Sequence, residues 1–218
     1  MDSAAARQGL IVDWGGVLTE RLDLAVRAWA EHEHIDLEAY RRAMMRWLGP
    51  EEQLEVTVNP IHALERGELG VPDFEQRLAA GMQHLDGHPV QADGLLDRMF
   101  GYFERAHAMN SLVFRAHQHG IRTALLSNSW GNTYPRDGWD DMFDVVVISG
   151  EVGMRKPERE IFDLTCTRLE VNAHDCVFVD DLAVNTAAAD ELGMTAVLHR
   201  SYDETAARLE ELFGVPLA

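Results

Sequence analysis

The stretch GLIVDWGGVLTE, residues 9–20, begins with an apolar run and changes character at a single aspartate. Leu10–Val12 has the length and composition of a short buried strand, and Asp13 follows where that strand would end. Gly15 and Gly16 come next, so a flexible turn follows the carboxylate. The pattern places one acidic side chain at the carboxyl end of a strand, where α/β proteins bind their ligands.

Four later segments repeat this apolar pattern: Thr123–Leu126, Val145–Ile148, Val177–Val179 and Thr195–Leu198. Continuous rather than alternating apolarity predicts strands that are buried on both faces, as in a parallel sheet. Helical patterns separate or follow these strands, over residues 111–119, 157–170, 185–192 and 204–213. Strands that alternate with helices predict a doubly wound parallel α/β sheet of the Rossmann-like type.

The segment from residue 21 to 107 differs because it contains no convincing strand. Its patterns predict helices over residues 22–32, 37–48, 60–66, 72–85 and 93–107. We therefore predict an α/β core domain made of residues 1–20 and 108–218, with residues 21–107 as an inserted helical domain. An insertion directly after the first strand would lie over the carboxyl edge of the sheet, where ligands bind.

The composition, with 46% hydrophobic and 26% charged residues, is that of a globular protein. No apolar run approaches the roughly 20 residues that span a bilayer, and the opening residues MDSAAARQG hold no apolar signal core, so we expect a cytoplasmic protein. A net charge of −18 argues against nucleic acid and membrane partners. An anionic substrate would therefore need a local positive group or a metal. The pattern gives no indication of the oligomeric state.

Polar groups follow four of the predicted strands: Asp13, Ser127 with Asn128, Lys156, and Asp180 with Asp181. If the strands are parallel, these groups meet at one edge of the sheet. A carboxylate can attack phosphorus and form an aspartyl-phosphate, and Mg²⁺ is held by carboxylate oxygens together with phosphate oxygens. A lysine can neutralise the charge that develops during transfer. The set therefore suits phosphoryl transfer.

The four motifs LIVDWGGVLT, ALLSNS, GEVGMRKPEREIF and VFVDDLAVN together resemble those of the haloacid dehalogenase-like (HAD) hydrolase superfamily. The resemblance extends from residue 9 to about residue 214, and the helical insertion is similar to the cap domain of that family. The forms D-x-G-G-V-L and V-D-D-L-x-V-N look most like the branch that includes the phosphatase domain of soluble epoxide hydrolases and sugar-phosphate phosphatases.

The resemblance implies a Mg²⁺-dependent phosphatase that acts on a small phosphorylated metabolite. Asp13 would be the nucleophile and a ligand of Mg²⁺, and Gly15 would offer its backbone carbonyl to the metal. Asp181 would bind the metal directly, and Asp180 would act on it directly or through water.

The other motif residues would hold the phosphoryl group. Ser127 would bind it, with Asn128 beside it, and Lys156 would be the motif lysine, which acts in catalysis and in phosphate binding. Trp14, next to the nucleophile, is expected to pack at the mouth of the site and to touch the substrate.

The chain departs from the family at Gly15. Most phosphatases of the family carry there a second aspartate, which protonates the leaving oxygen and later activates water. Three interpretations stay open: substrates with good leaving groups, proton transfer by water or another group such as Thr19, Tyr134 or a histidine of the insertion, or a weak or inactive phosphate-binding protein. A metal-independent dehalogenase also lacks that aspartate, but it would have little use for Asp180 and Asp181.

Overall fold

The computed structural model describes residues 7–48, 59–131 and 133–218. At its centre lies a five-stranded sheet with the order β3-β2-β1-β4-β5. Its strands are β1 (Gly9–Val12), β2 (Arg122–Ser127), β3 (Val145–Ile148), β4 (Cys176–Asp180) and β5 (Thr195–Leu198). All neighbouring strands are parallel. The predicted doubly wound parallel sheet is confirmed.

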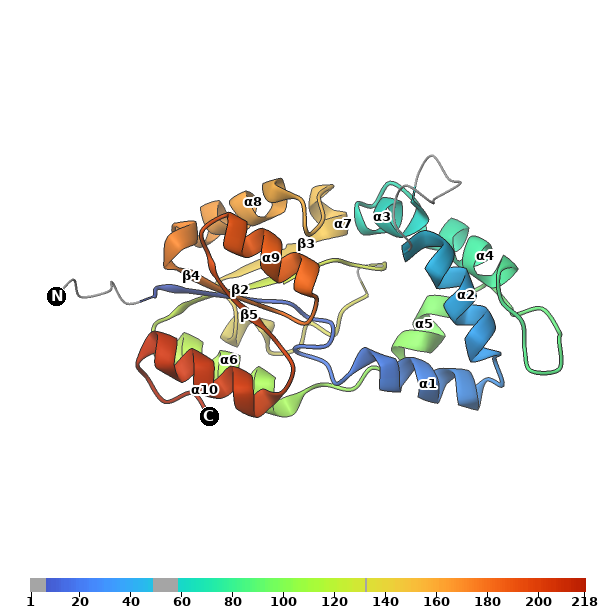
Figure 1. The fold of residues 1–218 in the computed structure, drawn as a ribbon, viewed down its shortest axis with the longest axis horizontal. Coiled ribbons are helices and arrows are strands. Elements are labelled where there is room, and N and C mark those ends of the chain that lie inside the picture. The colour runs from blue at the N-terminus through green and yellow to red at the C-terminus, as the bar shows by residue number, and fades with distance from the viewer. Residues whose placement is uncertain (1–6, 49–58, 132) are drawn as a thin grey trace.

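Helices cover both faces of this sheet (Figure 1). Helices α6 (His107–Gln118) and α10 (Tyr202–Phe213) lie on one face, and α8 (Arg159–Leu169) and α9 (Ala183–Glu191) lie on the other. The residues of β1 are continuously apolar because both of its faces are covered. Leu10 and Val12 belong to the cluster under α6 and α10, whereas Ile11 belongs to the cluster under α8. Successive side chains of a strand point to opposite faces, so a central strand with two covered faces needs an unbroken apolar run.

The residues between β1 and α6 form five helices in the part of the chain that the structure describes: α1 (Leu22–His32), α2 (Leu37–Leu48), α3 (Pro60–Glu65), α4 (Val71–Ala80) and α5 (Leu95–Phe100). They lie beyond the carboxyl ends of the strands (Figure 1). Trp29, Phe74, Leu78 and Leu95 contribute to an apolar cluster of their own. We call residues 21–107 the helical insertion.

The prediction of one helix over residues 72–85 is wrong in its extent. Helix α4 ends at Ala80, and Gly81 caps it. The following residues instead make isolated antiparallel pairs, of Gln83 with Pro89 and of His84 with Ile35. These backbone pairs, one of them with the distant residue Ile35, take the place of further helical turns.

The prediction of a helix over residues 93–107 also fails for its second half. Helix α5 ends at Phe100, and α6 begins at His107, four residues before the predicted start at 111. Between them the chain returns to the sheet beside the segment that left it: Thr19 pairs with Arg105, and the Glu20 N–H donates to the Glu104 carbonyl at 2.8 Å. These hydrogen bonds keep residues 104–106 out of a helix.

We call the outgoing residues 18–20 and the returning residues 104–106 the linker pair. The Ala106 N–H and the Asn110 side-chain amide both donate to the Leu18 carbonyl, at 2.9 and 2.8 Å. The predicted domain boundaries, after residues 20 and 107, fall beside this pair. Within the described ranges, no helix is both long and apolar enough to cross a membrane.

Candidate active site

Three carboxylates converge at the carboxyl edge of the sheet. Asp13 follows β1 and Asp180 ends β4, and these strands are neighbours in which Val12 is paired with Val179. One carboxylate oxygen from each of Asp13, Asp180 and Asp181 lies within 4.8 Å of the others. The parallel register therefore brings together residues that are far apart in the sequence, as predicted.

Lys156 completes this carboxylate cluster. Its Nζ lies 2.8 Å from Asp13 Oδ1 and 2.7 Å from Asp180 Oδ2, and its side chain is 1% exposed. Burial alone would lower the pKa of Lys156, but the two carboxylates outweigh it, so the pKa is raised and the ammonium group keeps its charge. Lys156 therefore fixes the orientation of Asp13 and supplies one positive charge.

One lysine does not neutralise three carboxylates. Burial raises the pKa of Asp13 to about 7, although the Lys156 ammonium acts in the opposite direction. Burial, and next the charge of Asp180, raise the pKa of Asp181 to about 6. A site that is short of positive charge and built from oxygen donors fits a hard divalent cation. The carboxylates of Asp13, Asp180 and Asp181 are the groups that could hold such a cation.

Asp180 and Asp181 differ in their surroundings. Asp180 is fully buried, and its carboxylate accepts hydrogen bonds from Lys156, from the Leu182 N–H at 2.8 Å and from the Asn185 amide at 3.1 Å. Asp181 is partly exposed beside it. Asp180 is thus fixed by protein donors, whereas Asp181 is the one of the two that a metal could reach more freely.

Gly16 is required for this arrangement. Its φ of +72° lies in the left-handed region, and an added Cβ would lie 2.4 Å from Asp181 Oδ2. Its N–H donates to Thr19 Oγ1 at 2.9 Å. The turn after Asp13 therefore passes directly against Asp181, which only glycine permits.

Gly16→Ala is expected to weaken Mg²⁺ binding by displacing Asp181, in addition to a loss of about 1–2 kcal/mol from the left-handed backbone. Gly120→Ala is the matched control, because Gly120 has a φ of +79° and no atom within 4 Å of an added Cβ. Both variants should lose unfolding free energy in thermal denaturation, but only Gly16→Ala should lose Mg²⁺ affinity in titration calorimetry. Equal Mg²⁺ affinity in the two variants would contradict this account.

The phosphate-binding candidates Ser127 and Asn128 have different surroundings. Ser127 is 2% exposed at the end of β2, and its Oγ lies 2.9 Å from the Tyr134 hydroxyl. The Asn128 side chain instead clamps the backbone of Lys156: its Nδ2 donates to the Lys156 carbonyl at 2.9 Å, and its Oδ1 accepts from the Lys156 N–H at 2.8 Å. The Asn128 side-chain amide is therefore engaged in holding the Lys156 backbone.

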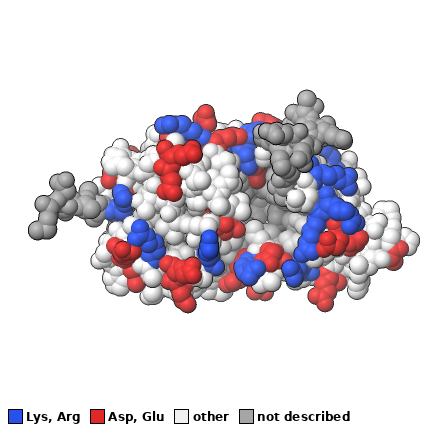
Figure 2. All heavy atoms as spheres, in the orientation of Figure 1, with Lys and Arg blue, Asp and Glu red and all other residues white. Residues whose placement is uncertain are grey.

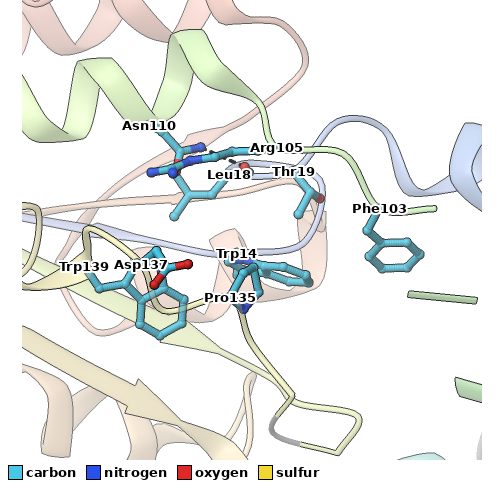
Figure 3. Close-up of a pocket in the computed structure, with 9 residues that line it drawn as sticks. All are labelled: Trp14, Leu18, Thr19, Phe103, Arg105, Asn110, Pro135, Asp137 and Trp139. Atoms are coloured by element: carbon cyan, nitrogen blue, oxygen red, sulfur yellow. Dashed lines mark hydrogen bonds between the residues drawn. The ribbon is translucent and has the colours of Figure 1, made fainter. Parts of the chain in front are cut away.

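Trp14 points to a cavity of about 140 Å³ beside the linker pair. The residues around this cavity (Figure 3) are Trp14, Leu18, Thr19, Phe103, Arg105, Asn110, Pro135, Asp137 and Trp139. Trp14 packs edge-on against Tyr134 at 4.9 Å between ring centroids and stacks on Phe103 at 6.2 Å. Trp14 therefore borders the linker pair. No carboxylate of the cluster lines this cavity, and the expected contact of Trp14 with substrate stays a prediction.

Of the candidates for proton transfer, Tyr134 is the one whose hydroxyl contacts Ser127, a predicted phosphate-binding residue. Thr19 Oγ1 already accepts from Gly16 and donates to the Glu20 carbonyl at 3.1 Å. In the insertion, His84 Nδ1 is paired with the Glu33 carbonyl at 3.0 Å. Tyr134 contacts Ser127, and burial raises the pKa of its phenol, so the hydroxyl stays protonated.

Sequence reasoning missed two groups near the cluster. Asn185 lies within the quoted VFVDDLAVN motif and binds Asp180, so its position in the motif was an available signal. Glu65 of the insertion contacts Arg155, the residue before Lys156, over 90 positions of sequence. A contact of this kind leaves no local pattern.

Charges of both signs are interspersed over the face shown in Figure 2, where a hollow separates the sheet-containing part from the helical insertion. With a net charge of −18, the chain offers an anion no general attraction. A phosphate group would therefore depend on local groups such as Lys156 and a bound cation.

The sequence profile of the haloacid dehalogenase-like hydrolase family matches residues 8–193. The chain belongs to this family of enzymes, as its motifs indicated. Among curated relatives, bifunctional epoxide hydrolase 2 of Sus scrofa is 30% identical over 45% of this chain and 19% of that protein. Sesquiterpene phosphatase astK of Aspergillus oryzae is 32% identical over 34% of this chain and 38% of that protein. The matched stretches thus cover well under half the length of these relatives.

Solved structures share the fold at low identity. The HAD family enzyme bt-2542 of Bacteroides thetaiotaomicron, in complex with magnesium and inorganic phosphate, has a TM-score of 0.59 and 20% identity over 88% of this chain and 94% of that one. A dehalogenase has a TM-score of 0.65 and 20% identity over 97% of this chain and 98% of that one. The fold is thus shared with a dehalogenase and with an enzyme that binds magnesium and phosphate, so the fold alone does not assign an activity to this chain.

Proposed function

We propose that this hydrolase is a Mg²⁺-dependent phosphomonoesterase that acts through an aspartyl-phosphate at Asp13. The observation that carries the proposal is the convergence of Asp13, Asp180 and Asp181 around Lys156. The phosphatase among the relatives and the magnesium and phosphate bound by bt-2542 support it.

In the first step a carboxylate oxygen of Asp13 attacks phosphorus, and the bond from phosphorus to the ester oxygen breaks. Lys156 holds Asp13 in place and balances charge on the phosphoryl group, and Ser127 donates to one of its oxygens. Bound Mg²⁺ would neutralise phosphate charge, held by Asp13, Asp181 and the Gly15 carbonyl. In the second step water attacks phosphorus, and the bond from phosphorus to the Asp13 oxygen breaks. The protons of the water leave with inorganic phosphate, as dihydrogen phosphate, and Asp13 is restored as a carboxylate.

Gly15 limits the substrate class. The residue has no side chain to protonate the leaving oxygen, so esters whose alcohol leaves as a stable anion would react best. Acyl phosphates and sugar 1-phosphates meet this condition. We infer that the helical insertion acts as a cap that excludes water and selects among such small phosphorylated metabolites.

The dehalogenase alternative gains less support from the site. A halide leaves without protonation and without metal, which fits Gly15. In the same reaction Asp13 would still attack, but the carboxylates of Asp180 and Asp181 would have little use. An inactive phosphate-binding protein would use Lys156 and Ser127 to hold a phosphate group but would not hydrolyse its ester.

The test is phosphate release from a panel of esters with graded leaving-group pKa, from acyl phosphates and p-nitrophenyl phosphate to sugar 6-phosphates, with Mg²⁺ and with EDTA. We expect release that requires Mg²⁺ and declines steeply as the leaving-group pKa rises. Halide release from 2-haloacids in EDTA would favour the dehalogenase. Folded protein that binds Mg²⁺ and releases nothing would favour the binding protein.

Mg²⁺ is also expected to stabilise the fold, because it relieves repulsion among buried carboxylates. At about 100 times its Kd, a ligand that binds only the folded state adds about 2.7 kcal/mol to the unfolding free energy. Differential scanning fluorimetry with increasing Mg²⁺ should show this rise for the wild type but not for Asp181→Asn. An equal rise for Asp181→Asn would contradict the assignment of Asp181 as a ligand.

A further inference from the structure

Glu65, the last residue of α3, joins the helical insertion to both loops that carry the phosphate-binding groups. Its Oε2 lies 2.5 Å from Arg155 Nε, and Arg155 directly precedes Lys156. Its Oε1 accepts a hydrogen bond from Trp130 Nε1 at 3.3 Å, and Trp130 lies three residues after Ser127. Each carboxylate oxygen thus contacts a different motif loop.

This contact is buried. The side chains of Arg155 and Glu65 are 14% and 9% exposed, in contrast to the ion pair of Arg159 with Asp163 on α8, whose side chains are 71% and 55% exposed. A buried charge is tolerated only when it is paired. If the Glu65 carboxylate moves away, the Arg155 guanidinium is left unpaired in a largely buried position, next to Lys156 in the chain.

Packing around the pair is equally close. Trp130 lies against Phe74 of α4, edge-on at 5.4 Å, and joins the apolar cluster of the insertion. Gly67, just after α3, passes so near to α7 (Ser149–Val152) that an added Cβ would lie 2.9 Å from the Gly150 carbonyl. Glu65 is therefore seated in a continuous interface between the insertion and the sheet-containing part.

The interface lies away from the linker pair. Figure 1 shows α3 beside α7 on one side of the molecule and the two linkers on the other, near α1. The insertion is thus attached covalently on one side and through Glu65 on the other. The carboxylate cluster lies at the carboxyl ends of β1 and β4. Any rotation of the insertion about its linkers would separate Glu65 from Arg155 and Trp130.

We infer that Glu65 is a positioning residue: its carboxylate sets the places of the Lys156 and Ser127 loops, and it does so only while the insertion is seated on the sheet. The inference rests on the proposed function for its catalytic consequence. The Asn128 clamp on the Lys156 backbone extends the same chain of contacts, because it ties the two loops to each other. Seating of the insertion and completion of the site would then be one event.

The test uses Glu65→Gln in the full chain, which keeps the shape and a carbonyl acceptor but removes the charge. We expect kcat to fall by about 10- to 100-fold through misplacement of Lys156, with a smaller change in KM. Hydrogen exchange should rise at residues 128–131 and 154–158 and stay unchanged in the strands. Asp163→Asn, which breaks the exposed pair on α8, is the matched control and should alter neither readout.

The double variant Glu65→Gln with Arg155→Gln removes both charges, so it should exchange more slowly in these loops than Glu65→Gln alone. Unchanged exchange in both loops, or a uniform rise over the whole sheet, would overturn the inference, because the first shows no coupling and the second a merely structural role. The exchange readout decides even if the wild type releases no phosphate, a result that would count against the proposed function alone.

Discussion

The Asp13→Asn variant is expected to lose phosphate release by at least about 10³-fold, because an amide cannot act as the nucleophile. The substitution is nearly isosteric, so the position of the side chain above β1 should persist. Phosphate release should be measured on the best ester of the panel, under Mg²⁺ saturation, so that weakened metal binding does not account for the loss.

The fold of this variant should survive. Lys156 keeps its partner Asp180 at 2.7 Å. Since burial raises the pKa of Asp13 to about 7, ionised Asp13 opposes folding at higher pH, and its removal should not lower the melting temperature at pH 8. Asp163→Asn serves as the control for removal of one carboxylate at the surface. Asp13→Asn protein that melts normally and still releases phosphate at the wild-type rate would rule out Asp13 as the nucleophile.

Gly15→Asp is expected to raise the rate on sugar 6-phosphates by about 10²–10⁴-fold, the range that a general acid contributes. The new carboxyl group can protonate an alkoxide that otherwise leaves poorly. Space for it is nearly present: an added Cβ would lie 3.2 Å from Leu22 Cδ1, the tip of a partly exposed side chain. Leu22 needs to shift by only a few tenths of an ångström.

The matched control is Gly15→Asn, which has the same size and cannot donate a carboxyl proton. The gain should be absent there, and it should be small for p-nitrophenyl phosphate even in Gly15→Asp, because that leaving group needs no proton. Addition of Leu22→Ala to Gly15→Asp should preserve or increase the gain by making room. Equal rates for Gly15→Asp and Gly15→Asn would mean that the missing acid is not what limits this enzyme.

Much of the α/β part could be predicted from the sequence because its signals are local. The continuous apolar run Leu10–Val12 is typical of a strand covered on both faces, and Asp13 follows where it ends. Once the strands are parallel, Asp13, Ser127 and Asp180 must share one edge, whatever the loops between them do. The helices of the insertion were predicted well where they are amphipathic, as over residues 22–32, and poorly where distant pairing ended them.

By itself, then, the sequence determined the sheet, the edge at which the site lies and the residue types gathered there, since each follows from patterns a few residues long. Only the tertiary structure decided what those residues contact. In the structure the Asn128 amide binds the Lys156 backbone, Trp14 lies beside the linker pair, and Glu65 contacts Arg155. These contacts join residues that are far apart in the sequence, and the Glu65 contact also requires that the insertion packs against the sheet-containing part. Contacts between distant segments leave no periodicity or spacing in either segment alone.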